Sequence, residues 1–103
     1  ARTYRYIARE LSLEVKPADP EQYVPRFASR LDLPSEVERR AREYVAEAAE
    51  RGISVGRNPS GVAAACLYTA ARDRDHPLTQ AEAASAAGVT PVTVRNTYTD
   101  LRE

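Results

Sequence analysis

Four residues near the C-terminus have the side-chain types that read the edges of DNA bases. They are Val92, Thr93, Arg95 and Asn96. Arginine pairs bidentately with guanine, asparagine pairs with adenine, and the methyl groups of valine and threonine contact the thymine methyl group. Such side chains read the major groove when they lie on the outer face of the N-terminal half of a helix. A solvated polar face is the simpler alternative for the same residues.

The helix that carries these residues is expected to bury one stripe of apolar side chains. Val94, Tyr98 and Leu101 fall at positions i, i+4 and i+7, which is the spacing of one helix face. The four base-reading candidates then point outward. An exposed Val92 beside Arg95 has no place in a solvated polar face, so we expect this surface to contact DNA.

The segment 79–102 has the outline of two short helices joined by a tight turn, which is a helix-turn-helix. Thr79 and Glu82 are expected to form a capping box at the start of the first helix. Gly88 can adopt the left-handed conformation that ends this helix. The pair Thr90–Pro91 supplies an N-cap and a first helical residue for the second helix.

Alanines are expected to let the first helix of this motif approach its neighbours closely. Ala81, Ala84 and Ala87 lie at helical spacing, and their side chains end at Cβ. Val89, in the turn, is expected to point into the core. The two helices can then cross at the short distance that a helix-turn-helix requires.

A second set of residues is suited to contact DNA phosphates. The helix expected to begin at Asn58–Pro59 presents unpaired N–H groups at its N-terminus, beside Arg57. Ordinary capping by Asn58 is the alternative. The phosphate candidates are Arg57, Ser60, Thr90 and Thr99. Segment 56–61 has the glycine spacing of a nucleotide-binding loop but lacks the Lys and Ser/Thr that must follow, so nucleotide binding is rejected.

Neither catalysis nor metal binding is expected. The sequence has one cysteine, Cys66, and one histidine, His76. Cys66 lies in an apolar helical segment, where it is expected to fill the core, and His76 lies in a polar loop. Nothing assembles a nucleophile, a general base or a set of metal ligands, so we expect no enzyme activity and no cofactor.

The 103 residues are enough for one main domain with a modest core. Acidic and basic residues number 15 each, so the formal net charge is zero and no strong field holds nucleic acid nonspecifically. We therefore expect weak DNA affinity and help from a partner. No apolar run approaches the ~20 residues that cross a bilayer, and the N-terminus is too charged for a signal peptide. A soluble cytoplasmic protein is expected.

The fold class is expected to be all-α with six helices, because every long segment has helical periodicity and no strand pattern occurs. The first helix lies within 1–13 and is followed by an extended linker at 14–18. The second helix is expected to begin at Asp19–Pro20, with Gln22 available for a capping-box bond. Pro25 either kinks this helix or makes its first turn irregular.

The third and fourth helices are expected to differ in burial. The third should begin with a capping box of Ser35 and Glu38, and it has one apolar face. This face consists of Val37, Ala41, Tyr44, Val45 and Ala48. Its outer face allows the i,i+4 ion pairs Glu36–Arg40, Glu38–Arg42 and Glu47–Arg51. The fourth helix, from Asn58–Pro59, is apolar almost all round and is expected to be central.

Three stretches of the chain resemble archaeal transcription factor B, the counterpart of eukaryotic TFIIB, in its core of two cyclin-like repeats. The segment YRYIARELSLEVKPADPEQYVPRFASRL is similar to the end of the first repeat, the linker and the opening of the second. The segments NPSGVAAACLYTAA and TQAEAASAAGVTPVTVRNTYTDL are similar to later helices of the second repeat. Residues 2–7 are also similar to residues 96–101, as expected where a helix closes an earlier repeat.

The resemblance implies a five-helix cyclin-like repeat at 19–103, ending in the helix-turn-helix and preceded at 1–13 by the last helix of another repeat. It implies that Val92 and Arg95 contact bases of a promoter element just upstream of the TATA box, with TATA-binding protein holding the bent DNA. RNA polymerase would be recruited through N-terminal regions outside this sequence. The expected partners are therefore promoter DNA, TATA-binding protein and RNA polymerase, in an archaeal cell and near its nucleoid.

Two other functions compete with this interpretation. Cyclin-like helical bundles can serve as protein–protein adaptors that do not read DNA, and zero net charge suits that use. A fragment of an unrelated helix-turn-helix repressor would normally need a symmetric dimer to read two half-sites. We expect a monomer, which counts against the repressor.

Overall fold

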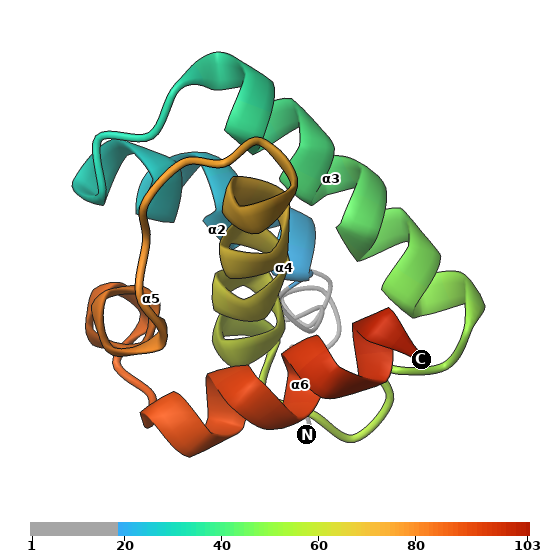
Figure 1. The fold of residues 1–103 in the computed structure, drawn as a ribbon. Helices are drawn as coiled ribbons and strands as arrows, with labels where there is room; N and C mark the ends of the chain where they lie inside the picture. The colour runs from blue at the N-terminus through green and yellow to red at the C-terminus, as the bar shows by residue number, and fades with distance from the viewer. Residues whose placement is uncertain (1–18) are drawn as a thin grey trace, which may run out of the picture.

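The computed structural model describes residues 19–103 and contains five α-helices in that range (Figure 1). They are α2 (Pro20–Arg30), α3 (Ser35–Glu50), α4 (Pro59–Asp73), α5 (Gln80–Ala87) and α6 (Pro91–Arg102). No strand occurs in the described range, so the all-α prediction is confirmed. The helix and linker expected at 1–13 and 14–18 lie outside the described residues.

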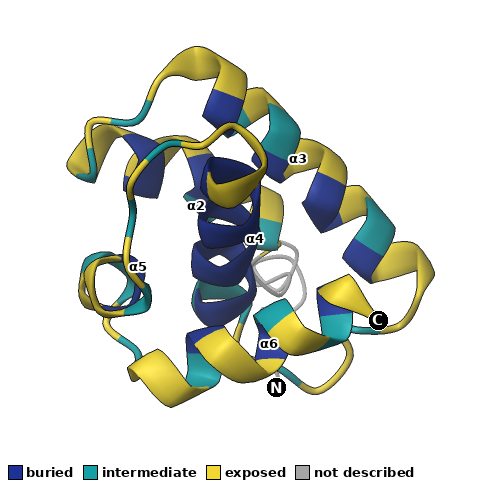
Figure 2. Cartoon of the chain, in the orientation of Figure 1, coloured by how far each residue is buried: buried dark blue, intermediate teal, exposed yellow. Residues whose placement is uncertain are grey.

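Helix α4 is the buried axis of the fold, as its composition predicts. Every residue from Gly61 to Ala71 is buried, and the helix is enclosed by the others on several sides (Figures 1 and 2). Small side chains dominate this segment, so neighbouring helices can approach it closely. The Asn58 carboxamide caps the helix by accepting from the Ser60 N–H at 2.9 Å.

The core divides into two clusters of buried side chains on different sides of α4. The larger cluster joins α4 to α2, α3 and the last turn of α6 through residues such as Phe27, Tyr44 and Leu101. The smaller cluster joins α4 to α5 and the middle of α6 through Tyr68 and Val94. Helix α6 therefore takes part in both clusters, and this ties the helix-turn-helix to the rest of the domain.

Helix α2 begins at the predicted cap and continues through its internal proline. The Asp19 carboxylate accepts from the Glu21 N–H at 3.1 Å. The capping-box bond expected from Gln22 does not form within the described residues. Pro25 has no N–H for the carbonyl of Glu21, but the helix extends on both sides of it. Burial of Phe27 on the same helix supports this continuity.

Helix α3 begins at Ser35, as predicted, but the predicted capping box of Ser35 and Glu38 is wrong. Pro34 is the N-cap, and no side chain caps this end, because Ser35 is already the first helical residue. The Pro34 carbonyl accepts from the N–H groups of Val37 and Glu38 at 3.0 and 3.2 Å. Glu38 uses its carboxylate on Arg42, at 2.9 Å, instead of returning to the cap. The predicted buried face of α3 is confirmed at all five positions.

Two of the three predicted ion pairs on α3 form. Glu38–Arg42 and Glu47–Arg51 both have an N···O distance of 2.9 Å. The pair Glu36–Arg40 is wrong, because Arg40 bonds to Glu43 at 2.6 Å and to Asp73 of α4 at 3.3 Å. In place of the predicted i,i+4 partner, Arg40 therefore has one partner at i+3 on its own helix and one on another helix.

Between residues 19 and 103, no helix combines the length and the apolar composition that crossing a bilayer requires.

Candidate nucleic-acid interface

Helices α5 and α6 form the predicted helix-turn-helix. At the start of α5, the Glu82 N–H donates to the Thr79 hydroxyl at 3.0 Å, and the Thr79 N–H donates to the Glu82 carboxylate at 2.9 Å. Gly88 ends this helix with a φ of +72°, in the left-handed region that a glycine adopts without strain. The predicted capping box and turn are therefore both confirmed.

The alanine face of α5 differs from the prediction by one position. Ala84 is buried and Ala87 packs against both core clusters, but Ala81 is exposed. Ala83 is fully buried in its place. The reason is that α5 packs against α4 and α6 together, so its buried face includes the adjacent pair at 83 and 84. Val89 packs inward, as expected.

The inner face of α6 has a polar member that the sequence pattern misses. Val94 and Leu101 are buried as predicted, and Thr97 is buried beside them. Tyr98 is half-buried and lies edge-on to Tyr68, with ring centroids 5.0 Å apart. Thr97 was missed because apolar spacing selects only apolar side chains, although threonine can be buried when its hydroxyl is bonded.

The outer face of α6 presents three of the four base-reading candidates to solvent. Val92 is 52% exposed, and Arg95 and Asn96 are also exposed. Within the described residues, the Arg95 side chain forms no ion pair, so its guanidinium fork is available to a ligand. The N-terminal half of α6 therefore carries an exposed apolar group, a cation and an amide in adjacent positions.

Thr93, the fourth candidate, lies at the border of this surface. It is half-buried, and its hydroxyl lies 3.1 Å from that of Thr90. The Thr90 hydroxyl also caps α6 by accepting from the Thr93 N–H at 3.3 Å. Thr99 is exposed, and its hydroxyl donates to the Arg95 carbonyl at 2.9 Å. Both threonines proposed for phosphate contact thus already form hydrogen bonds within α6: Thr90 caps the helix, and Thr99 bonds to a backbone carbonyl.

The N-terminus of α4 lies beside the first two turns of α6. Arg57, Asn58 and Val62 line a groove of about 320 Å³ together with Thr93, Asn96 and Thr97. Arg57 donates to the Thr97 hydroxyl at 3.0 Å and forms an ion pair with Asp100. Ser60 donates its hydroxyl to the capping Asn58 at 2.9 Å. The structure therefore places Arg57 in one groove with Thr93 and Asn96, and the Arg57 guanidinium already bonds to Thr97 and Asp100.

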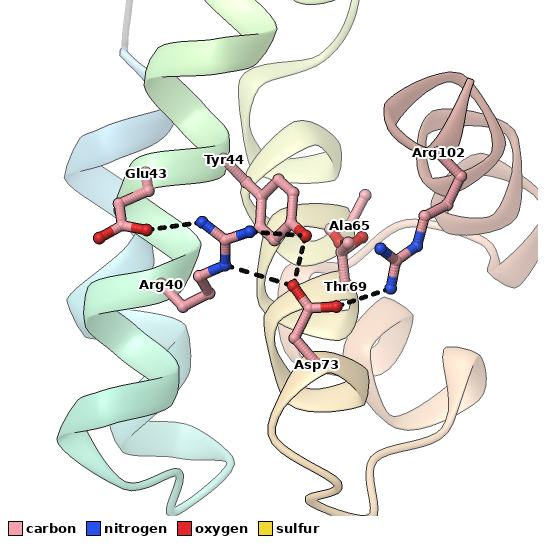
Figure 3. Close-up of polar contacts among 7 residues, drawn as sticks. All are labelled: Arg40, Glu43, Tyr44, Ala65, Thr69, Asp73 and Arg102. Atoms are coloured by element: carbon pink, nitrogen blue, oxygen red, sulfur yellow. Dashed lines mark hydrogen bonds and ion pairs between the residues drawn. The ribbon is translucent and has the colours of Figure 1, made fainter.

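The C-terminal end of α6 is held by side chains from two other helices. Arg51, which follows α3, donates to the carbonyls of Asp100 and Leu101 at 3.0 and 3.1 Å. Arg102 donates to Asp73 of α4 at 2.8 Å. Figure 3 shows that Asp73 lies between Arg102 on one side and Arg40 with Tyr44 on the other. This carboxylate thereby links α3, α4 and α6.

The contacts of Asp73 are accompanied by altered proton affinities. Burial of Tyr44, helped by its hydrogen bond to Asp73, raises the pKa of the phenol. Burial alone would raise the pKa of the Asp73 carboxyl, but hydrogen bonds from Tyr44, Arg102 and Arg40 outweigh it and lower that pKa. Hydrogen bonds to the ionised form have this effect. Asp73 is thus stabilised as a carboxylate.

The cysteine and the histidine do not join this surface. Cys66 is buried, and burial raises the pKa of its thiol to about 12, as for an inert core side chain. His76 lies in the α4–α5 loop. Among residues 19–103, no three His, Cys, Asp or Glu side chains are placed to hold a metal ion.

Comparisons with known proteins identify relatives of this chain. Residues 13–103 match the family model described as transcription factor TFIIB repeat. The chain is 56% identical to transcription initiation factor IIB 2 of Halobacterium salinarum and 55% identical to that of Haloferax volcanii, covering 99% of this chain and 31% of each relative. It is 52% identical to transcription initiation factor IIB of Methanocaldococcus jannaschii, over 99% of this chain and 15% of that protein. The chain thus spans less than a third of these curated relatives.

Proposed function

Because the chain belongs to the transcription factor TFIIB repeat family, we propose that it is a core piece of an archaeal general transcription initiation factor that binds promoter DNA. In this proposal it reads a promoter element just upstream of the TATA box, together with TATA-binding protein. The single observation that supports it best is the exposed group of Val92, Arg95 and Asn96 on the second helix of a helix-turn-helix.

Base recognition would come from the N-terminal half of α6 in the major groove. Arg95 would donate bidentately to a guanine, and Asn96 would pair with an adenine. Val92 would contact a thymine methyl group, which accounts for a large apolar side chain that is 52% exposed. Thr93 lies beside them with its methyl group toward α4, so it is the least accessible of the four.

Phosphate contacts would come from the residues that border this surface. Hydroxyl groups would come from Ser60 at the start of α4, Thr90 at the N-cap of α6 and Thr99 on α6, and Arg57 would supply a cation from the α4 side. A guanidinium has five N–H donors, so its bonds to Thr97 and Asp100 leave others for a phosphate oxygen. Such contacts position the protein and carry no sequence information.

The partners follow from the charge and from the family. A net charge of zero cannot supply strong nonspecific affinity, so TATA-binding protein would hold the bent DNA against this surface. RNA polymerase would be contacted through other regions of the full-length factor. We propose that 1–13 closes a preceding repeat, that 14–18 is a linker, and that 19–103 reads DNA as a monomeric second repeat.

An amide-shift NMR titration tests this function. The chain is titrated with a duplex that carries a purine-rich element upstream of a TATA box, and in parallel with a duplex of scrambled sequence. Shifts confined to residues 90–99 and much larger with the promoter duplex support sequence recognition by α6. If no shifts occur even with TATA-binding protein present, the proposal fails and the adaptor function is favoured.

A further inference from the structure

Gly61 is a helical glycine in a place where helix formation alone does not favour glycine. It is the third residue of α4, and it is buried in the described structure. Glycine is a poor helix former because it loses more conformational freedom on folding than any other residue. Its backbone there is not left-handed, since no positive φ is recorded for it. Its presence therefore needs a steric reason.

The steric reason is the close approach of α6. A Cβ atom built on Gly61 would lie 3.0 Å from the Thr93 methyl carbon and 3.7 Å from a Val89 methyl carbon. Contacts at 3.0 Å are shorter than ordinary van der Waals contact between carbon atoms, which begins near 3.5 Å. An alanine at 61 would therefore push the first turn of α6 away from α4, or force Thr93 to rotate.

Thr93 has little freedom to rotate away. Its hydroxyl lies 3.1 Å from the Thr90 hydroxyl, and its N–H donates to that same oxygen at 3.3 Å. Rotation of its side chain would break the hydroxyl contact at the cap of α6. The side-chain conformation of Thr93 is therefore coupled to both the cap of α6 and Gly61. Val92 and Arg95, in contrast, are exposed to solvent.

We propose that Gly61 and Thr93 form a contact that sets how the N-terminal half of α6 sits on the domain, so that Thr93 is a positioning residue for the readers Val92, Arg95 and Asn96. This inference rests on the proposed function. A binding surface must be held to within about 0.5 Å for its contacts to form, and the Gly61 contact acts on that scale. An added methyl group at 61 thus weakens base discrimination without touching DNA.

The test is a double-mutant cycle of Gly61→Ala and Thr93→Ser, measured first by thermal unfolding without DNA. Serine keeps the hydroxyl and removes the methyl carbon that opposes Gly61. In the wild-type background, Gly61→Ala should lower Tm by about 5 °C, because the site becomes overpacked. In the Thr93→Ser background, the same change should leave Tm unchanged or raise it by about 3 °C, because alanine is the better helix former.

The second measurement is the ratio of affinities for the promoter duplex and the scrambled duplex in the presence of TATA-binding protein. Gly61→Ala should lower this ratio about fivefold, near the cost of one mismatched base pair. In the Thr93→Ser background, the added Gly61→Ala change should leave the ratio within about twofold of that of Thr93→Ser alone. All variants are compared at a temperature well below the Tm of each, where every variant is folded, so a lower ratio reports altered positioning of α6 and not unfolding.

Four outcomes would overturn the inference. Equal Tm effects of Gly61→Ala in both backgrounds would show that no steric contact couples the two residues. A loss of discrimination in Thr93→Ser alone would make Thr93 a base contact. A wild-type chain that discriminates, with a Gly61→Ala variant that discriminates equally, would refute positioning and leave the proposed function intact. If the wild type does not discriminate, both the proposed function and the positioning role fail.

Discussion

The two halves of helix α6 differ in what surrounds their polar side chains. In the N-terminal half, Arg95 and Asn96 are exposed beside an exposed Val92. In the C-terminal half, Asp100 is paired with Arg57, and Arg102 is paired with Asp73. One short helix thus combines an accessible surface at one end with an attachment to the domain at the other. Because of this separation, Val92, Arg95 and Asn96 can contact a ligand without breaking the contacts that attach α6 to the domain.

The attachment at the C-terminal half depends on apolar burial more than on its ion pairs. The paired side chains of Arg57, Asp100 and Arg102 are one-third exposed or more, and exposed ion pairs each contribute about 0–1 kcal/mol. Leu101 is only 5% exposed within the larger core cluster. The ion pairs therefore orient the last turn, and the leucine supplies most of its stability.

The largest expected effect comes from removing that leucine. Leu101→Ala should lower the free energy of unfolding by about 2–4 kcal/mol, because it leaves a cavity where α6 meets α4. Urea unfolding followed by circular dichroism measures the change. Val92→Ala is the matched control on the accessible half and should stay within about 0.5 kcal/mol of wild type. Equal losses in both variants would contradict the contrast between the two halves.

The second-largest expected effect is a loss of DNA-binding affinity on removal of the Arg95 side chain. Arg95→Ala should cost about 1–3 kcal/mol of binding free energy, confined to one base position, with no change in unfolding. Competition binding against duplexes substituted one base pair at a time provides the measurement, with TATA-binding protein present.

Arg74→Ala is the matched control for Arg95→Ala, because Arg74 is an exposed arginine that follows the far end of α4. It removes the same charge next to Asp73, which bonds to the C-terminal half of α6, and not on the face that carries Arg95, so any loss should be small and equal for all duplexes. If Arg95→Ala also weakened every duplex equally, Arg95 would be a phosphate contact and the accessible half would carry less sequence recognition than proposed.

Asp73 provides a smaller effect that depends on pH. Its folded-state pKa is lowered, so its stabilisation is complete above the ordinary carboxyl pKa of 3.8 and is lost as the pH falls through the lower folded value. Asp73→Asn should therefore cost about 1 kcal/mol of stability at pH 7, from the weakened bonds to Tyr44 and Arg102. Urea unfolding at a series of pH values, from 7 down to the most acidic pH at which the chain is still folded, checks this.

The difference in stability between wild type and Asp73→Asn should shrink at the acidic end, since the wild-type carboxyl is then protonated as well. Discrimination between promoter and scrambled duplexes at pH 7 should be unchanged. A difference that stays constant with pH would mean that the Asp73 charge does not stabilise the fold. A loss of discrimination would mean that the C-terminal contacts also determine base recognition.

The smallest effect comes from the ion pair that links the two surfaces. Asp100→Asn should release Arg57 for phosphate contact and raise affinity for both duplexes alike, by about twofold to fivefold, which is the worth of an exposed ion pair. Fluorescence anisotropy at two salt concentrations measures it. The matched control Glu103→Gln removes the same charge three residues away and should raise affinity less.

The Asp100→Asn gain should disappear in an Arg57→Ala background, because no guanidinium is then released. A gain that persists there would come from the lost negative charge alone, and Arg57 would not be a phosphate contact. A gain for the promoter duplex only would place Arg57 among the base-reading residues.

The predictions that proved correct depend on interactions within one turn of helix. The capping box of Thr79 with Glu82, the turn at Gly88 and the cap at Asn58 each need residues no more than four positions apart. The outward placement of Val92 and Arg95 follows from helical periodicity and was likewise predictable. Local geometry repeats in every helix, so the residue types identify it.

Two of the predictions that failed concern residues that contact another helix. Spacing along α3 pairs Arg40 with Glu36, but Arg40 bonds to Glu43 on its own helix and to Asp73, which the fold presents from α4. Spacing along α5 selects Ala81, but its contacts with two helices bury Ala83. An amphipathic pattern assumes one buried face, and it cannot represent a helix packed on two neighbours.

The sequence by itself determined the helical class, the order of the described helices, the turn that joins α5 to α6 and the residues on the outer face of α6. Those features depend on propensities and short-range bonds that each segment can form alone. Only the tertiary structure decided that Gly61 opposes Thr93, that Arg57 pairs with Asp100 and that Asp73 joins three helices. These contacts link residues 29 to 43 positions apart by helix crossing, and no spacing along the chain encodes the angle at which two helices meet.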